Sequence, residues 1–421
     1  MTTNPDVVRR RRTRTEAMGL RRAAAEPDAE AIVDPYSWTD PKRYLWLLGL
    51  IPAAAVLLVW GMHSLLGIWF SGWAIDWAWW GGPIVVFIII PLLDYFIGND
   101  GSNPPDEVMA KLEADKYYQW TLYAYIPLQY GSLIAAAYLW GRGDLSVFDS
   151  IGLALTAGVA SGIGINTAHE LGHKKDQLER WLSKITLAPT WYGHFYVEHN
   201  RGHHVRVATP EDPASARWGE PIYLFVFRSF WGSLVHSIEL EQKRAARKKR
   251  SFWHPDNDVL NAWAMSLVLY AALTAAFGWI VLPYLIFQGA IGILYLESVN
   301  YIEHYGLLRK KLDNGRYERC QPRHSWNADH IVTNVFLYHL QRHSDHHANP
   351  TRRYQTLRSF DEAGNLPSGY AAMIAVAMIP PFWRAVMDDR VIAHADGDIE
   401  RINVRPSKLP QLKKAVAAHA G

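Results

Sequence analysis

Histidine is the residue type whose placement points to chemistry in this chain of 421 residues. Nine of the 18 histidines fall into three short motifs and one single position, each following an apolar segment. Side chains three or four residues apart share one face of a helix, whereas adjacent side chains point in different directions. Nine imidazoles exceed what one ion can take, so the pattern predicts two metal ions. The nine candidate ligands are His169, His173, His199, His203, His204, His304, His343, His346 and His347.

The residue types leave the metal open, because neutral imidazole suits iron, copper, nickel and zinc. His169-Glu-Leu-Gly-His173 alone matches the zinc protease motif, with Glu170 as the general base. Catalytic zinc usually takes about three protein ligands, so such a site leaves most of the histidines unexplained. Two irons that bind dioxygen would use the whole set. A metal transporter is a further alternative, for which ligands near the middle of several membrane spans are expected.

Acidic and amide residues beside the histidines are candidate orienting groups. A carboxylate there could hydrogen-bond to the far imidazole nitrogen or bind the metal directly, and a solvated role at a helix end is equally open. The acidic candidates are Glu170, Glu198, Glu303 and Asp345, and the weaker amide candidates are Asn166, Asn200 and Asn300.

The apolar residues gather into runs that approach the roughly 20 residues needed to cross a bilayer. They predict an all-α integral membrane protein with six transmembrane helices and a helical histidine region on the cytoplasmic side. Buried helices of a large soluble protein are the alternative. The runs lie near residues 45–60, 77–97, 117–140, 147–168, 260–276 and 279–302.

Lysine and arginine set the expected orientation, because they accumulate on the cytoplasmic side of membrane proteins. They are frequent before the first run and in the segment 169–258, so both termini are expected in the cytoplasm and the protein in the inner membrane. The domain boundaries follow: a basic, disordered tail over 1–40, a membrane domain over 41–390 with cytoplasmic segments 169–258 and 303–390, and a C-terminal cytoplasmic tail over 391–421. The basic tail needs no nucleic-acid partner.

The single cysteine, Cys320, excludes an internal disulfide and any iron centre held by several thiolates within this chain. Electrons for a redox reaction would therefore come from another protein.

The four motifs closely resemble those of the membrane alkane 1-monooxygenases, within the wider family of histidine-box hydroxylases and desaturases. They read His169-Glu-Leu-Gly-His173, Glu198-His-Asn-Arg-Gly-His-His204, Asn300-Tyr-Ile-Glu-His-Tyr-Gly306 and Leu340-Gln-Arg-His-Ser-Asp-His-His347. The resemblance implies six membrane helices, a di-iron centre on the nine histidines, and hydroxylation of alkanes to 1-alkanols with O2. It also implies electrons from NADH through a reductase and rubredoxin. A related desaturase or xylene-type hydroxylase is the alternative.

Two further sets of residues follow from that activity. An alkane would enter from the lipid, and Val86 and Ile90, one helical turn apart before Pro91, could line its channel. Rubredoxins are acidic as a family, so basic residues near the motifs are expected to form the docking surface. These are Lys174, Lys175, Arg201, Arg206, Arg342, Arg352 and Arg353.

Overall fold

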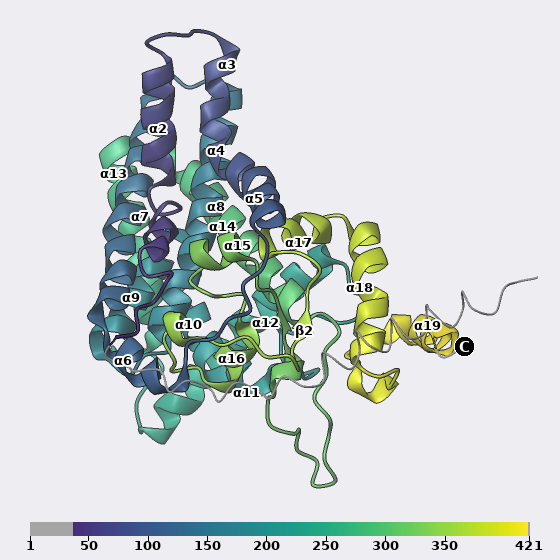
Figure 1. The fold of residues 1–421 in the computed structure, drawn as a ribbon. Helices are drawn as coiled ribbons and strands as arrows, with labels where there is room; N and C mark the ends of the chain where they lie inside the picture. The colour runs from purple at the N-terminus through teal and green to yellow at the C-terminus, as the bar shows by residue number, and fades with distance from the viewer. Residues whose placement is uncertain (1–36, 420–421) are drawn as a thin grey trace, which may run out of the picture.

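The structure, a computed structural model, describes residues 37–419, and this part of the chain is mostly helical (Figure 1). The expected tail over 1–40 lies outside the described residues as far as residue 36. The strands within the described range are β1 (Trp326–Asn327) and β2 (Gly364–Asn365), which pair in parallel. The expected helical architecture is therefore confirmed.

The helices follow one another along the whole described range. The first half forms η1 (Leu45–Leu50), α2 (Ala55–Leu66), α3 (Trp73–Asp76), η2 (Trp77–Trp80), α4 (Gly81–Ile84), the π-helix η3 (Val85–Ile89), α5 (Ile90–Ile97), η4 (Asp106–Val108), α6 (Met109–Ala114), α7 (Lys116–Arg142), α8 (Val147–Gly172), α9 (Gln177–Leu187) and η5 (Ala188–Thr190). The second half forms α10 (Phe195–Glu198), the π-helix η6 (His199–His203), α11 (His204–Arg206), α12 (Ile222–Arg247), α13 (Asp258–Phe277), α14 (Val281–His304), η7 (Pro322–His324), α15 (Ile331–Phe336), α16 (His343–Ala348), η8 (Tyr354–Thr356), α17 (Tyr370–Ala377), α18 (Pro380–His394), η9 (Ile399–Arg401), η10 (Pro406–Lys408) and α19 (Leu409–His419).

Four helices of the described chain are long and apolar enough to cross a membrane: Trp73–Ile97, which joins α3 to α5, and α8, α13 and α14. The pair α17 and α18, bent by 118°, would add a fifth as a broken span or a re-entrant loop. Among the six expected spans, α2 has only 12 residues. Helix α7 has 27 residues, but its tyrosines and glutamines make it more polar than those four. These helices fit a multi-pass membrane protein, and the count of six spans stays a proposal.

Helices α8 and α14 form the central pair that carries histidines of two motifs. A capping box of Ser146 and Asp149 starts α8, because each residue satisfies a backbone or hydroxyl donor of the other. Small residues then let the two helices approach closely. A Cβ added to Gly162 would lie 2.8 Å from the Cβ of Tyr295, and one added to Gly158 would lie 2.6 Å from the Cβ of Ile291. This close packing fixes the relative positions of the two helix ends.

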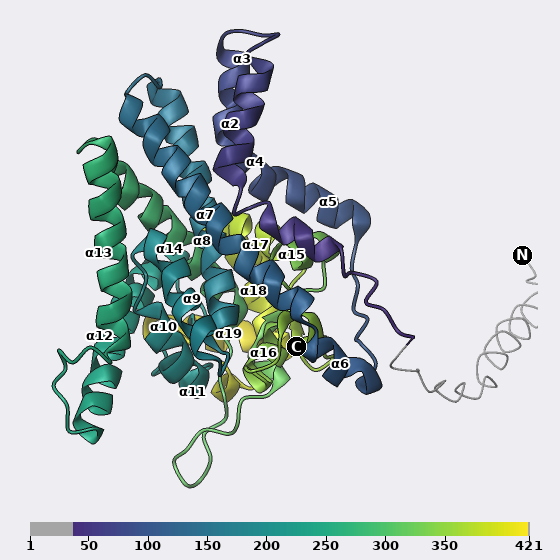
Figure 2. The same ribbon diagram turned by 90° about the vertical axis from the view of Figure 1, so that its left-hand side faces the viewer.

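The histidine motifs lie at one end of the helical bundle. The hairpin of α2 and α3 projects at the opposite end, at the top of Figures 1 and 2. In both views α10, α11 and α16 gather below the spans. The fold thus separates an apolar, span-forming part from a compact helical part that holds the motifs.

The segment beyond residue 390, expected as a tail, contributes buried residues to the core as far as Leu412. Val391, Ile402 and Leu412 belong to the same buried cluster as Tyr305. Ile402 also forms a backbone bridge with Leu307, which directly follows the motif Asn300–Gly306. The chain after α18 therefore packs against the helices that carry the histidines.

Candidate metal centre

All nine predicted histidines converge in the structure and form two groups. Helix α8 contributes His169 near its end, His173 follows directly as the C-cap of α8, and α14 contributes His304 as its last residue. The other histidines come from η6, α11 and α16. The five-histidine group is His169, His173, His199, His204 and His346, and the four-histidine group is His203, His304, His343 and His347.

Within the groups, the Nε2 atoms of eight of the nine histidines lie close to one another. In the first group, His204 Nε2 lies 3.0 Å from His199 Nε2 and 3.1 Å from His346 Nε2. In the second group, His347 Nε2 lies 3.2 Å from His203 Nε2 and 2.9 Å from His343 Nε2. Each Nε2 carries one proton or one lone pair, so hydrogen bonds do not satisfy two such contacts at once. A cation at the centre of each group would satisfy all of them, and the donor set therefore fits a bound metal ion.

The second motif divides its histidines between the groups because its helix is wound as a π-helix. His199 belongs to one group with His204, and His203 belongs to the other. Bonds from residue i to i+5 bring the side chains of His199 and His204 onto one face. An α-helical turn would instead place His199 on one face with His203. The adjacent histidines His203 and His204 still point to different groups, as predicted.

Burial keeps these histidines neutral and available as ligands. It lowers the pKa of His199, His204 and His346 well below the ordinary value, and the neighbouring imidazoles lower it further. The pKa values of His343 and His347 are lowered for the same reasons. Neutral imidazole is the form that binds metal ions.

Asp212 is an orienting residue that sequence reasoning missed. Its Oδ2 lies 2.9 Å from His203 Nδ1, so the carboxylate accepts the ring proton and leaves Nε2 to face the centre. Burial alone would raise the pKa of Asp212, but His203 and the Ser215 hydroxyl lower it to about 2. Asp212 lies in the loop after the second motif, nine residues beyond His203. No helical spacing in the sequence connects the two.

Glu303 is the carboxylate, among the four expected, that contacts a histidine of the groups. Its Oε2 lies 3.3 Å from His343 Nε2, the atom that faces the centre of the four-histidine group. Its Oε1 has no hydrogen-bond partner among the described residues, and the side chain is 1% exposed. Glu303 is therefore placed to bind a metal directly rather than to orient an imidazole.

The other three expected carboxylates hold the surrounding elements together. Glu170 pairs with Lys174 at 2.8 Å and accepts the backbone N–H of Tyr354. Glu198 accepts from His236 Nδ1 at 2.6 Å and from Arg206.

Asp345 is bound by both Arg352, at 2.8 Å, and the backbone N–H of Arg358. The expected amide residues also bond to surrounding elements rather than to the histidines. Asn166 donates to the carbonyl of Leu337, and Asn200 donates to that of Tyr196. Asn300 instead contacts Glu297 at 3.4 Å. None of these contacts reaches a ring nitrogen of the nine histidines.

An apolar cavity of about 220 Å³ lies between α2, the Trp73–Ile97 helices and α8. Val86 and Ile90 both line it, together with Met62 on α2 and Ile163 on α8. Val86 lies in the π-helix η3. Ile163 precedes His169 by six residues, or about 9 Å along the helix axis, so the cavity approaches the five-histidine group.

Two of the basic residues expected at a docking surface are buried. Lys174 is 6% exposed and bonds to Glu170 and the carbonyl of Arg352. Arg342 is 0% exposed and donates to the carbonyls of Asp100 and Ser102, both at 2.9 Å. Their assignment to the docking surface is wrong, because both cations satisfy groups inside the fold.

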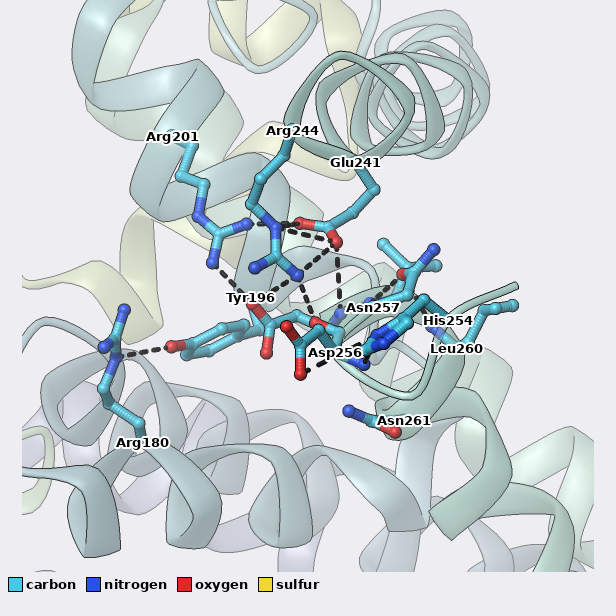
Figure 3. Close-up of polar contacts among 12 residues, drawn as sticks. Arg180, Tyr196, Arg201, Glu241, Arg244, His254, Asp256, Asn257, Leu260 and Asn261 are labelled. Carbon is cyan, nitrogen blue, oxygen red and sulfur yellow. Dashed lines mark hydrogen bonds and ion pairs between the residues drawn. The ribbon is translucent and has the colours of Figure 1, made fainter. Parts of the chain in front are cut away.

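The other five basic residues reach the surface to different degrees. Lys175 is exposed. Arg201 is partly exposed and pairs with Glu241 and Asp258, and Figure 3 shows Arg201 and Arg244 both directed at Glu241. The remaining partly exposed ion pairs are Arg206 with Glu198, Arg352 with Asp345 and Arg353 with Glu179.

The class of protein follows from a family model for fatty acid desaturases, which matches residues 150–377. That range covers more than half of the chain and includes all nine converging histidines. The fold and the site are thus those of one family of helical, histidine-rich proteins.

Individual relatives narrow the assignment. The chain is 50% identical over 374 residues to the alkane 1-monooxygenase of Acinetobacter baylyi. The matched region covers 89% of this chain and 90% of the relative. It is 45% identical over 377 residues to alkane 1-monooxygenase 1 of Alcanivorax borkumensis, covering 89% and 91%. The hydroxylase component of a xylene/toluene monooxygenase of Pseudomonas putida is 27% identical over 337 residues, covering 77% and 84%. The chain belongs to the alkane 1-monooxygenases.

Proposed function

We propose that this protein hydroxylates alkanes at the terminal carbon, using two irons held by the nine histidines. The convergence of nine imidazole donors in two groups carries the proposal. Iron bound there would supply the binding and reduction of dioxygen that an unreactive C–H bond requires. The ligands are His169, His173, His199, His204 and His346 for one iron, and His203, His304, His343 and His347 for the other.

The surroundings of the site argue against the alternative metal chemistries. In a zinc protease Glu170 would act as general base, but it is paired with Lys174 and with the backbone of Tyr354. In a transporter ionisable ligands would lie near the middle of several spans, whereas here they gather at one end of the bundle. A desaturase or a xylene-type hydroxylase would share the metals and differ in product.

In the proposed reaction, the side chains of the protein position the metal ligands and the alkane and keep water out. Asp212 holds His203 with Nε2 toward the centre, and Glu303 stands beside the four-histidine group. The cavity lined by Val86, Ile90 and Ile163 would hold the alkane chain with one methyl group toward the irons. Because its walls are apolar, the alkane would enter from the lipid, and water would be kept from the reacting carbon.

Electrons would come from reduced rubredoxin, itself reduced by an NADH-dependent reductase. The chain has one cysteine, so it cannot itself hold an iron centre ligated by several thiolates. We propose that the acidic carrier docks on the side of the motifs, where Lys175, Arg201, Arg206, Arg352 and Arg353 are at least partly exposed. In this arrangement the chain crosses the membrane six times. The end of the bundle that holds the histidine motifs and both termini face the cytoplasm.

The test supplies the purified, iron-loaded protein with rubredoxin, its reductase, NADH and a series of n-alkanes. The expected products are 1-alkanols, one for each NADH consumed. Unsaturated products from an acyl substrate would instead support a desaturase, and oxidation of xylene without oxidation of any alkane would support the aromatic hydroxylase.

A further inference from the structure

Arg201 lies in the middle of the π-helical turn η6, between His199 and His203, and is anchored to two other helices. Its Nη1 donates to Glu241 of α12, and its Nη2 donates to Asp258, the first residue of α13. Figure 3 shows the guanidinium directed at Glu241. A guanidinium is a planar, rigid fork, so two bound acceptors fix its direction. The orientation of η6 is therefore tied to α12 and α13.

The two acceptors of Arg201 are themselves held in place. Glu241 is 1% exposed, and it accepts hydrogen bonds from Arg244 Nε at 2.9 Å, from Arg244 Nη2 at 2.7 Å and from the backbone N–H of Asp258 at 3.3 Å. Asp258 also pairs with Lys184 of α9 at 3.1 Å, and Lys184 is buried. A buried carboxylate is stable only with such partners. Arg201 is thus bound to a rigid network rather than to mobile surface groups.

Helix α12 contacts the second motif at another point, directly before the turn. His236 Nδ1 lies 2.6 Å from Glu198 Oε2. The Glu198 side chain lies against the turn itself, because a Cβ added to Gly202 would be 2.6 Å from Glu198 Oε1. His236 and Glu241 are five residues apart on α12. Together they hold the motif both before η6 and within it.

The winding of η6 decides which histidines can share a metal. With about 3.6 residues per turn, residues five apart in an α-helix are turned by about 140° from each other. An α-helical turn would therefore direct His199 and His204 to different sides, whereas here their Nε2 atoms lie 3.0 Å apart. Single π-helical turns are rare, and unusual backbone conformations persist where the surroundings hold them.

We propose that Glu241 is a positioning residue that acts through Arg201: it keeps η6 π-helical and so assigns His204 to the five-histidine group. Without this contact the turn relaxes toward α-helical winding, and His204 leaves the group. His203 stays in the four-histidine group, because Asp212 holds its ring from the loop after α11. The inference rests on the proposed metal centre and concerns the binding of the metals.

Two substitutions remove the contact from opposite ends. Arg201→Gln leaves Glu241 paired with Arg244, so the buried carboxylate keeps a cation, and Glu241→Gln removes the charge at nearly constant size. Each should weaken cobalt(II) binding at the five-histidine group by about 10- to 100-fold, as expected when a metal ligand loses its orienting partner. The double variant should bind cobalt no more weakly than R201Q, because both changes break one contact. The matched control is Glu239→Gln, since Glu239 is an exposed residue of α12 that pairs with Lys243.

Cobalt binding to the metal-free protein is measured for one group at a time. A His347→Ala background leaves only the five-histidine group with its full donor set, and a His204→Ala background leaves only the four-histidine group. At the four-histidine group the affinity should not change. At the five-histidine group, R201Q and E241Q should strengthen the visible absorption of cobalt, because a centre that loses one of five imidazoles becomes four-coordinate. E239Q should match its background in affinity and absorption.

A loss confined to the five-histidine group in R201Q supports the proposal whether or not E241Q folds. Wild-type affinity and absorption in R201Q, additive losses in the double variant, or equal losses at both groups would each overturn it. Equal losses would mean that the contact only stabilises the fold. A wild-type protein that binds two cobalt ions but hydroxylates no alkane when loaded with iron would instead refute the proposed function and leave the positioning role intact.

Discussion

The Nε2 atoms of His199 and His204 lie 3.0 Å apart although the residues are five positions apart in the chain. An α-helix places residues i and i+4 on one face, whereas the π-helical turn η6 does so for i and i+5. The turn therefore directs His199 and His204 into one group and releases His203 to the other. One short motif in this way supplies ligands to both proposed irons.

This division predicts that the two irons can be removed separately. His204→Ala takes a ligand only from the five-histidine group, and His347→Ala only from the four-histidine group. Each variant should retain about one iron per chain, because the other group keeps its full donor set. Elemental analysis of the purified variants measures this. The control His254→Ala, at a partly exposed position outside the two groups and labelled in Figure 3, should keep two irons. Loss of both irons from a variant with wild-type circular dichroism would contradict separable groups.

Asp212→Asn should weaken the metal at the four-histidine group, because an amide is a poorer acceptor for the Nδ1 proton of His203. Loss of such an orienting partner costs roughly 10- to 100-fold in metal affinity. Competition with a chelator measures the affinity. Glu211→Gln changes the exposed neighbouring residue and should leave it unaltered. Equal affinities of D212N and the wild type would show that Asp212 does not orient His203.

Val86→Trp should shorten the longest alkane accepted, because the larger side chain would fill part of the cavity of about 220 Å³. Ile88→Trp is the control, since Ile88 lies in the same π-helical segment but is 53% exposed and does not line the cavity. Analysis of the products formed from a series of alkanes measures the longest chain that each variant accepts. A chain-length profile that is the same in V86W and the wild type would remove Val86 from the channel.

Lys175→Glu should slow reduction by rubredoxin and weaken its dependence on salt, because an exposed charge near the site acts on the encounter rate. Lys413→Glu makes the same change on α19, at an exposed position away from the motifs, and should have no effect. Stopped-flow reduction at several ionic strengths provides the measurement. Rates that are independent of salt in the wild type would refute an electrostatic docking surface.

Acid should destabilise the metal-free protein. Burial lowers the folded-state pKa of His199, His204 and His346, whereas in the unfolded chain these groups titrate near 6.5. Below that pH the unfolded state binds more protons than the folded state, so the free energy of unfolding falls as the pH is lowered from about 7 to 5. Thermal unfolding measured across this pH range tests whether the stability of the metal-free protein falls as the pH is lowered. Bound metal should reduce the effect near neutral pH, because protons and metal compete for the same nitrogens.

The sequence was sufficient to predict the nine histidines and the helical class, because both depend on residue type and local spacing. The partners of the motif carboxylates were not predictable in this way. Glu198 and Glu303 stand in similar positions before a histidine, yet Glu198 bonds to His236 on α12 and Glu303 contacts His343 on α16. Which neighbour each carboxylate meets is decided by helix packing between distant segments.

The same holds for Asp212 and for the basic residues. Asp212 reaches His203 because the loop after α11 folds back, and no periodic pattern marks that turn. Lys174 and Lys175 are adjacent in the chain, but only Lys174 faces Glu170 and the interior. Charge alone therefore does not separate surface cations from buried ones.

The central claim is that the nine histidines bind two irons. Elemental analysis of the wild-type protein, purified from iron-supplied cells and exchanged free of loose metal, tests it most directly. Two irons per chain are expected. A single zinc per chain, with no iron bound after reloading under anaerobic conditions, would contradict it.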